Sequence, residues 1–382
     1  MRIRIIILSV LFITAAHAGA EVRPATARPQ PGSKQFLEQG SGDVVSLTPW
    51  SGSFDVATGA RGIAMGSALV ANPYLKSSFR FNPALLAESE GLEVYYSIRP
   101  MNVGRYEEDY YSVGMVMESS VAGFALDYSR YNSDQYSTLI LPEGIYTRME
   151  RYDYTVTASA GMRVYPGLSA GVSLKYHKRG VNYTSMNLDD PGGEVIWGGD
   201  LGLSYRSSGF YSAGRIEDNF RFALALRNSG TSAESYGIKY ELPVILRAGI
   251  SYQLSHGTES GRDFVRLMLA GEYRRWMNDD GIYEDSTDYF NYGMEFAFQE
   301  AIYLRFGGMV APEYGIYGRD DMVLFYGAGL ELPLERFSRA AVPLSLSLDY
   351  AYIPSVDSNY LYDSDNSANV LTIALRYGNQ LF

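Results

Sequence analysis

The feature that most constrains this chain is a period-two alternation of apolar and polar residues from Gly91 onward. It recurs in runs of about 8 to 12 residues, one run about every 20 residues. In residues 168–177, Leu168, Val172 and Leu174 fall on one face, with serines and Lys175 on the other. Successive side chains of a strand point to opposite faces, so each run predicts a strand with one apolar and one polar side. The chain is therefore expected to be all-β.

Composition agrees and removes several classes of chemistry. Among 382 residues there are 33 tyrosines, 39 glycines and no cysteine, a balance that suits strands and turns. Without cysteine the chain has no disulfide, iron–sulfur cluster, thiolate zinc site or cysteine nucleophile. Three histidines argue against a multi-histidine metal site, and no metal or cofactor is expected. A net charge of -11 argues against a nucleic-acid partner, because phosphate backbones attract basic surfaces.

Two architectures fit the alternation: a soluble sandwich with its apolar face inward, or an outer-membrane barrel with that face toward lipid. Three observations favour the barrel. The runs are close to the ~9–11 residues of a tilted membrane-spanning strand. Tyrosine, tryptophan or phenylalanine recurs near their ends, as in interfacial girdles. The polar faces carry charges of both signs in mid-strand, which predicts a charged lumen network of Lys175, Asp200, Arg247, Arg266, Glu272, Glu295, Arg305, Asp349 and Arg376.

The pattern predicts a 14-stranded antiparallel transmembrane β-barrel. The predicted strands are 91–99, 109–117, 121–131, 151–163, 168–179, 195–206, 219–229, 243–254, 264–276, 290–299, 302–310, 322–332, 344–353 and 369–378. Long and short connections alternate between them, which predicts long loops outside and both termini on the periplasmic side. Three connections on the short side, 207–218, 255–263 and 333–343, are long for periplasmic turns.

The N-terminal part divides into three predicted segments. Residues 1–20 have a basic start, an apolar stretch over 5–16 and small residues after it, which predicts a signal peptide. Residues 21–57 are polar, rich in Pro, Gly, Ser and Gln, and predict a flexible periplasmic leader. Residues 58–90 precede the barrel of 91–382. The expected location is the outer membrane of a Gram-negative type cell, and the terminal Phe382 makes the barrel-insertion machinery an expected partner.

Residues 58–90 are rich in small and apolar residues, so they could fold into the barrel as a plug. They carry Gly59-Ala60-Arg61, Met65-Gly66 and Asn82-Pro83-Ala84-Leu85-Leu86-Ala87. In these motifs the chain resembles the PorV/PorQ family of outer-membrane proteins, relatives of the FadL-type hydrocarbon transporters. The resemblance implies a 14-stranded barrel with residues 58–90 as a hatch inside the lumen. The hatch residues are then Gly59, Arg61, Met65, Gly66, Phe79, Phe81, Asn82, Pro83, Ala84 and Leu85.

Three functions remain open at this point. The first is a barrel that binds and passes small hydrophobic molecules, gated by the hatch. The second, implied by the PorV resemblance, is a docking or shuttle component of a type IX-like secretion system, which would bind secreted proteins through loops 132–150 and 354–368. The third is a structural barrel with a closed, salt-bridged lumen. In each, the lipid bilayer and lipopolysaccharide are expected partners.

Enzyme and metal motifs are weak. Residues 167–171 match the Gly-x-Ser-x-Gly nucleophile elbow, but that motif needs a strand-turn-helix context and here it leads into a strand. The chain is therefore not expected to be an enzyme. Acidic clusters at 278–285 and 363–366 do not follow the EF-hand calcium pattern, and are expected to be solvated loops.

Overall fold

In the computed structural model, all of the described residues lie within 47–382. The predicted signal peptide and leader, 1–20 and 21–57, lie outside the described residues. The structure describes residues 59–73, 76–88, 91–103, 106–119, 121–135, 149–183, 194–213, 216–235, 238–242, 244–257, 263–277, 288–314, 319–334, 343–353 and 368–377.

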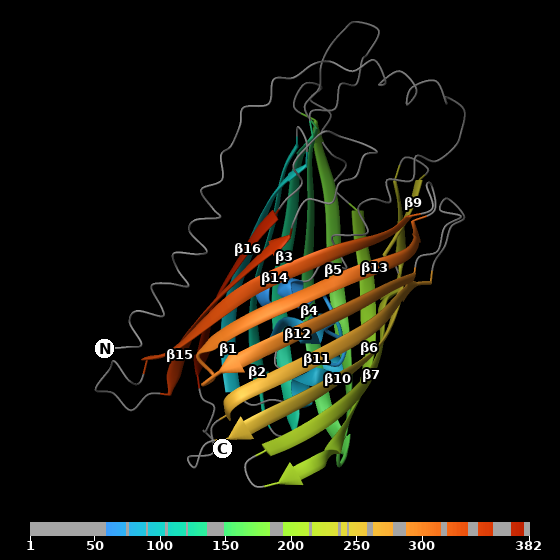
Figure 1. Ribbon diagram of the computed structural model, residues 1–382. Coiled ribbons are helices and arrows are strands. Elements are labelled where there is room, and N and C mark those ends of the chain that lie inside the picture. Colours follow the sequence, from blue (N-terminus) through green and yellow to red (C-terminus); the bar gives the residue numbers. More distant parts are fainter. Residues whose placement is uncertain are drawn as a thin grey trace, which may run out of the picture. The chain divides into compact units, whose positions relative to one another are not determined.

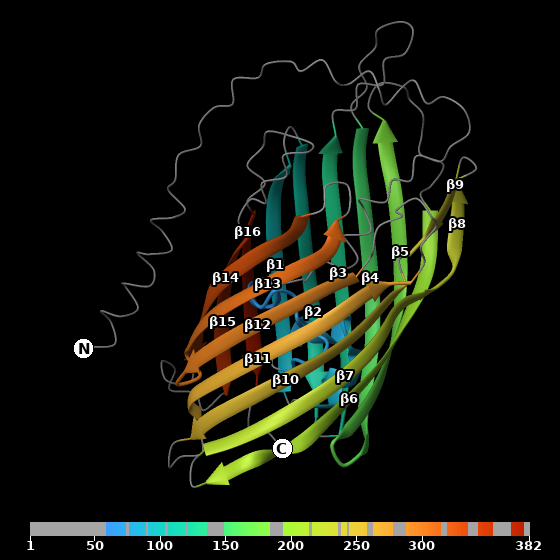
Figure 2. The same cartoon turned by 45° about the vertical axis from the view of Figure 1, so that its right-hand side comes forward.

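Fourteen antiparallel strands form a closed barrel, which confirms the predicted fold class (Figures 1 and 2). Neighbouring strands in the chain pair with each other, β7 pairs with β10, and β1 pairs with β16 to close the wall. The strands are β1 Gly91–Val103, β2 Tyr106–Glu118, β3 Ala122–Gln135, β4 Met149–Tyr165, β5 Leu168–Tyr183, β6 Glu194–Ala213, β7 Ile216–Gly230, β10 Ile245–Gly257, β11 Asp263–Trp276, β12 Asp288–Phe298, β13 Ile302–Tyr314, β14 Arg319–Pro333, β15 Leu344–Ile353 and β16 Ala368–Tyr377.

The strands extend further than the alternation predicts. Only residues 104 and 105 separate β1 from β2, where a connection over 100–108 was expected, and only 214 and 215 separate β6 from β7. The expected connection 230–242 contains a separate two-stranded hairpin, β8 Ser232–Ser235 paired with β9 Ile238–Glu241. Backbone pairing continues past the stretches in which apolar and polar residues alternate, so the period-two signal does not mark the strand ends.

The two faces of the wall are inverted relative to a soluble protein. Large apolar side chains lie on the outside: Leu174 is 57% exposed and Phe306 is 54% exposed. The charged residues next to them in sequence face inward and are buried, Lys175 at 6% and Arg305 at 1%. The described residues contain no helix that is long and apolar enough to cross a membrane.

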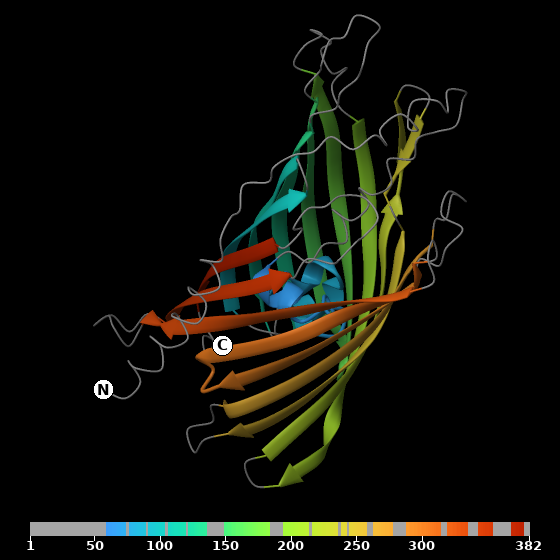
Figure 3. The same ribbon diagram turned by 45° about the horizontal axis from the view of Figure 1, so that its top comes forward.

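Inside this wall lie three short helices from the residues before β1, drawn in blue in Figures 1 and 3. They are α3 Ala60–Ala64 and the 3-10 helices η2 Lys76–Arg80 and η3 Pro83–Ala87. The Asn82 side chain caps η3 by accepting from the Ala84 amide at 3.1 Å, and Pro83 opens it, a favoured position for a residue without an N–H. The described residues of 59–88 are called the inner segment below.

Candidate functional site: the segment inside the barrel

The inner segment meets one wall of the barrel at a row of glycines. Gly123, Gly161, Gly171 and Gly202 are paired in register across β3, β4, β5 and β6, and all face inward. A Cβ atom added at any of them would collide with the segment between Asn82 and Leu86. The backbone of η3 therefore rests directly on the backbone of the wall, which only glycine permits.

A second, smaller seat lies on another part of the wall. Gly293 of β12 and Gly307 of β13 are paired with each other, and a Cβ atom on either would strike the backbone at Met65 and Gly66. The segment turns sharply there, with Gly66 at a positive φ of 65°. The Gly-Ala-Arg and Asn-Pro-Ala motifs thus contact wall strands far apart around the barrel.

Asn82 links the segment to itself and to the wall. Its buried side-chain amide donates to the Val70 carbonyl at 2.9 Å and to the Leu203 carbonyl of β6 at 3.1 Å. The side-chain oxygen of Asn82 accepts the η3 cap bond, so both the oxygen and the nitrogen of this amide bond within the protein. An apolar residue here would leave buried backbone groups without partners.

Arg61 is held by a cluster of wall charges. Its guanidinium donates through Nε and one terminal nitrogen to the Glu295 carboxylate, both at 2.7 Å. Glu295 also accepts from Arg305 at 2.7 Å and Arg266 at 3.3 Å, and Arg305 reaches Asp349 at 2.6 Å. One buried glutamate thus joins an arginine of the segment to two arginines of the wall.

Three further polar contacts fix the segment. Arg80 pairs with Asp127 of β3 at 3.0 Å. Glu88 accepts from Arg221 of β7 at 2.8 Å. The Glu272 carboxylate of β11 accepts from the backbone amides of Leu69 and Val70, both at 2.8 Å, and is itself paired with Arg247. The segment is therefore held by charge pairs around the lumen.

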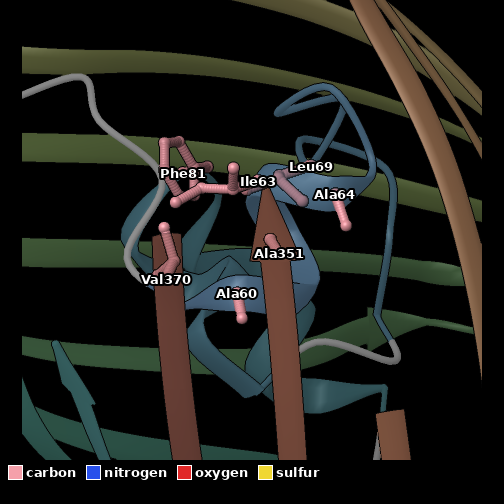
Figure 4. Packing of buried hydrophobic residues seen from close by; sticks show 7 residues of the cluster. All are labelled: Ala60, Ile63, Ala64, Leu69, Phe81, Ala351 and Val370. Atoms are coloured by element: carbon pink, nitrogen blue, oxygen red, sulfur yellow. The ribbon is translucent and has the colours of Figure 1, made fainter. Parts of the chain in front are cut away.

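An apolar face accompanies these charges (Figure 4). Ile63 and Leu69 pack with Phe81 and with small wall residues, and the half-buried Phe325 and Ile353 lie against the same cluster. The cluster of Figure 4 is Ala60, Ile63, Ala64, Leu69, Phe81, Ala351 and Val370. Phe81 also lies between Arg227 and Arg247, whose guanidinium carbons are 4.8 and 4.6 Å from its ring centre. Cations are attracted to the electron-rich face of an aromatic ring, so these two contacts also help to hold the inner segment in place.

The predicted lumen residues separate into distinct groups. Arg266, Glu295, Arg305 and Asp349 lie in the Arg61 cluster. Arg247 and Glu272 form a second pair, and Lys175 and Asp200 a third at 2.8 Å. Arg376 belongs to a fourth group, with Glu93 at 2.8 Å and Glu331 at 3.1 Å.

The predicted hatch residues include several with buried side chains in the inner segment. Met65, Phe79, Phe81, Asn82, Pro83, Ala84 and Leu85 are all buried there, and Gly59 is the N-cap residue of α3. Sequence reasoning missed Arg80 and Glu88 on the segment and their wall partners. A signal was available, since both charges flank the Asn-Pro-Ala motif.

The enzyme-like motif lacks the structural context that a nucleophile elbow requires. Ser169 of the Gly-x-Ser-x-Gly match is buried within β5, and no helix follows it. Among the described residues no group of three or more His, Asp or Glu could hold a metal ion. The clusters at 278–285 and 363–366 lie outside the described residues.

Glu295→Gln should destabilise the barrel strongly. Three arginines would lose a shared buried carboxylate, although Arg305 would keep Asp349, and removal of one partner of a buried pair costs about 3–5 kcal/mol. Urea unfolding of the protein in detergent micelles, followed by intrinsic fluorescence, measures the change. Met294→Leu, at the adjacent and lipid-facing position, serves as the control and should change stability little. Equal stability of the two variants would contradict the assigned role of Glu295.

No protein-family model and no curated protein matches the chain. Solved structures resemble it in fold. The toluene transporter TbuX of Ralstonia pickettii has 13% identity and a TM-score of 0.47, over 84% of this chain and 97% of that one. The toluene transporter TodX of Pseudomonas putida gives the same values. A FadL homologue of Pseudomonas aeruginosa has 12% identity and a TM-score of 0.44, over 84% and 98%.

At these identities and scores, the activities of these neighbours do not transfer to this chain. None of the three is a PorV or PorQ protein, so that resemblance stays a prediction. The closed barrel rests on the strand pairing of the chain itself.

Proposed function

We propose that this chain spans an outer membrane and passes small hydrophobic molecules, with the inner segment as its gate. The exposed apolar side chains of neighbouring strands support the membrane position, because a bilayer removes such a surface from water. Membership of the PorV/PorQ family is part of the same proposal. Its support is that the Gly-Ala-Arg and Asn-Pro-Ala motifs provide the contacts between segment and wall.

A row of aromatic rings also supports the membrane position. Tyr111, Tyr128, Tyr154, Tyr176 and Trp197 come one from each of β2 to β6, with consecutive ring centres 6.4, 6.1, 6.2 and 5.1 Å apart. Tyrosine and tryptophan have an apolar ring and a polar group, and they are enriched at the boundary between lipid chains and headgroups. This aromatic row therefore fits one edge of the membrane.

The apolar cluster of Figure 4 is the observation that favours a hydrophobic solute. Most of the buried inward-facing side chains of the wall are polar or charged, yet Phe325, Ile353 and Val370 place apolar surface beside α3. A molecule without hydrogen-bonding groups gains free energy only against such a surface. Displacement of α3 from β14, β15 and β16 would open this surface to the lumen.

Small molecules carried through purification test this function. The barrel is extracted from membranes in mild detergent, and its bound organic molecules are identified by mass spectrometry against the same barrel refolded from urea. Apolar molecules should be enriched severalfold in the membrane-extracted sample. Phe325→Ser should reduce the enrichment, whereas Leu324→Val, next in sequence and facing outward, should preserve it. Equal content in all samples would exclude a retained hydrophobic ligand.

A further inference from the structure

Two basic residues stand immediately beyond the aromatic row on the outer face of the wall. Arg130 follows Tyr128 by two positions on β3, and Lys178 follows Tyr176 by two on β5. Because strand side chains alternate, each cation shares the outward face of the ring that precedes it. Both lie late in strands that start after short turns, so they are on the side of the longer connections 136–148 and 184–193.

Strand register brings the two cations together. Arg130 is paired with Tyr154 of β4, and Tyr154 is paired in turn with Lys178. The three residues therefore form one row across three adjacent strands. With neighbouring strands about 4.8 Å apart, the two cations flank the ring at a backbone separation of about 10 Å. Nε of Arg130 donates to Oδ1 of Asn132 at 2.7 Å, which orients its planar group.

The row places two cations beside each other on the surface of an acidic protein. A third residue of the same kind, Arg275, follows Tyr273 by two positions, but it is paired with Asp288 at 3.7 Å. Within the described part of the chain, neither Arg130 nor Lys178 has a carboxylate partner of that kind. The exposed carboxylate of Asp109 lies one row further out, in register with Asn132. Arg275 therefore offers a matched comparison.

We propose that Arg130 and Lys178 bind the phosphate groups of a membrane lipid at the loop end of the barrel. Guanidinium and ammonium groups are well suited to bind phosphate. Each is also attracted electrostatically to an anionic lipid surface. The acyl chains would lie against Leu126 and Leu174, outward apolar residues on the same two strands. The site borders this apolar band directly, which favours a lipid over free phosphate. The inference rests on the proposed membrane position.

The test uses full-length protein in detergent micelles and native mass spectrometry, with three probes. These are diphosphorylated lipid A, the same lipid with its phosphates removed, and inorganic phosphate. The wild-type protein should bind the phosphorylated lipid best. Arg130→Gln combined with Lys178→Gln should weaken that binding about thirtyfold, because each Lys or Arg near an anionic lipid surface contributes about 1 kcal/mol. Arg275→Gln should bind as the wild type does.

Several outcomes would overturn the site. Equal binding of both lipids by the wild type would do so, as would equal losses in the double variant and in Arg275→Gln. If inorganic phosphate displaced the lipid at an equal concentration, a lipid would be excluded as the source of the bound phosphate groups. If the double variant fails to fold, two measurements still test the site. One is lipid binding by the charge-conserving variant Arg130→Lys with Lys178→Arg, and the other is the comparison of the two lipids on the wild-type protein. Separately, a barrel that does not insert into liposomes would refute the membrane position, whereas insertion without lipid preference would refute only this site.

Discussion

Deletion of residues 58–88 should convert a closed barrel into an open one. Barrels of this size are too wide for wall side chains to fill, and this lumen is occupied by the inner segment. Without the segment, the lumen keeps a charged wall that water can solvate. Proteoliposome swelling in sugar solutions should therefore accelerate severalfold, because a water-filled barrel lets small solutes through and a plugged one does not.

The control deletion removes residues 21–46, which precede the inner segment. It should leave swelling at the level of the intact chain. Correct folding of both deletions is checked by their resistance to unfolding in gel electrophoresis without heating. Equal swelling by the intact chain and the 58–88 deletion would show that the segment does not close the lumen.

Gly171→Ala should unseat the inner segment. The added methyl group would meet the backbone of Pro83 and Ala84, and a backbone cannot move aside as a flexible side chain can. Overpacking of this kind costs about 1–3 kcal/mol. Part of the population should relieve it by moving η3 away from the wall. Lower stability to urea and faster sugar leakage are therefore expected together.

Gly271→Ala is the matched control, because it makes the same chemical change on the outer face. A Cβ atom there lies 3.8 Å from the Ile250 side chain, an ordinary contact. That variant should match the wild type in leakage and should be at least as stable. A Gly171→Ala protein that is as tight and as stable as Gly271→Ala would contradict the glycine seat.

The alternation of residues was sufficient to predict the barrel. Period two is a local property, so Lys175 and Arg305 could be assigned to the polar face without knowledge of their partners. Strand ends were less accessible, because β6 continues through residues 207–213, where apolar and polar residues no longer alternate regularly. The β8–β9 hairpin was missed for a different reason: its strands are four residues long, too short to show a periodic pattern.

Partners could not be predicted, because they depend on register between distant strands. Glu295 and Arg61 are 234 positions apart, and nothing in the spacing of either reveals the other. Gly171 was expected on the polar face of its strand and in an enzyme-like motif, but its contact with the inner segment was not predicted. Its contact with Pro83 follows from the pairing of Gly161, Gly171 and Gly202, which exists only once β4, β5 and β6 are aligned.

The central claim is that the inner segment sits inside the barrel wall, and cysteine labelling tests it most directly. The chain has no cysteine, so a single one can be introduced without background. Ser78→Cys is a small change at a position that is 2% exposed, and Ser119→Cys marks an exposed position. Folded protein in detergent is treated with a polar maleimide. We expect rapid labelling at position 119, and protection at position 78 that disappears in urea. Equal labelling rates at the two positions in the folded protein would contradict the claim.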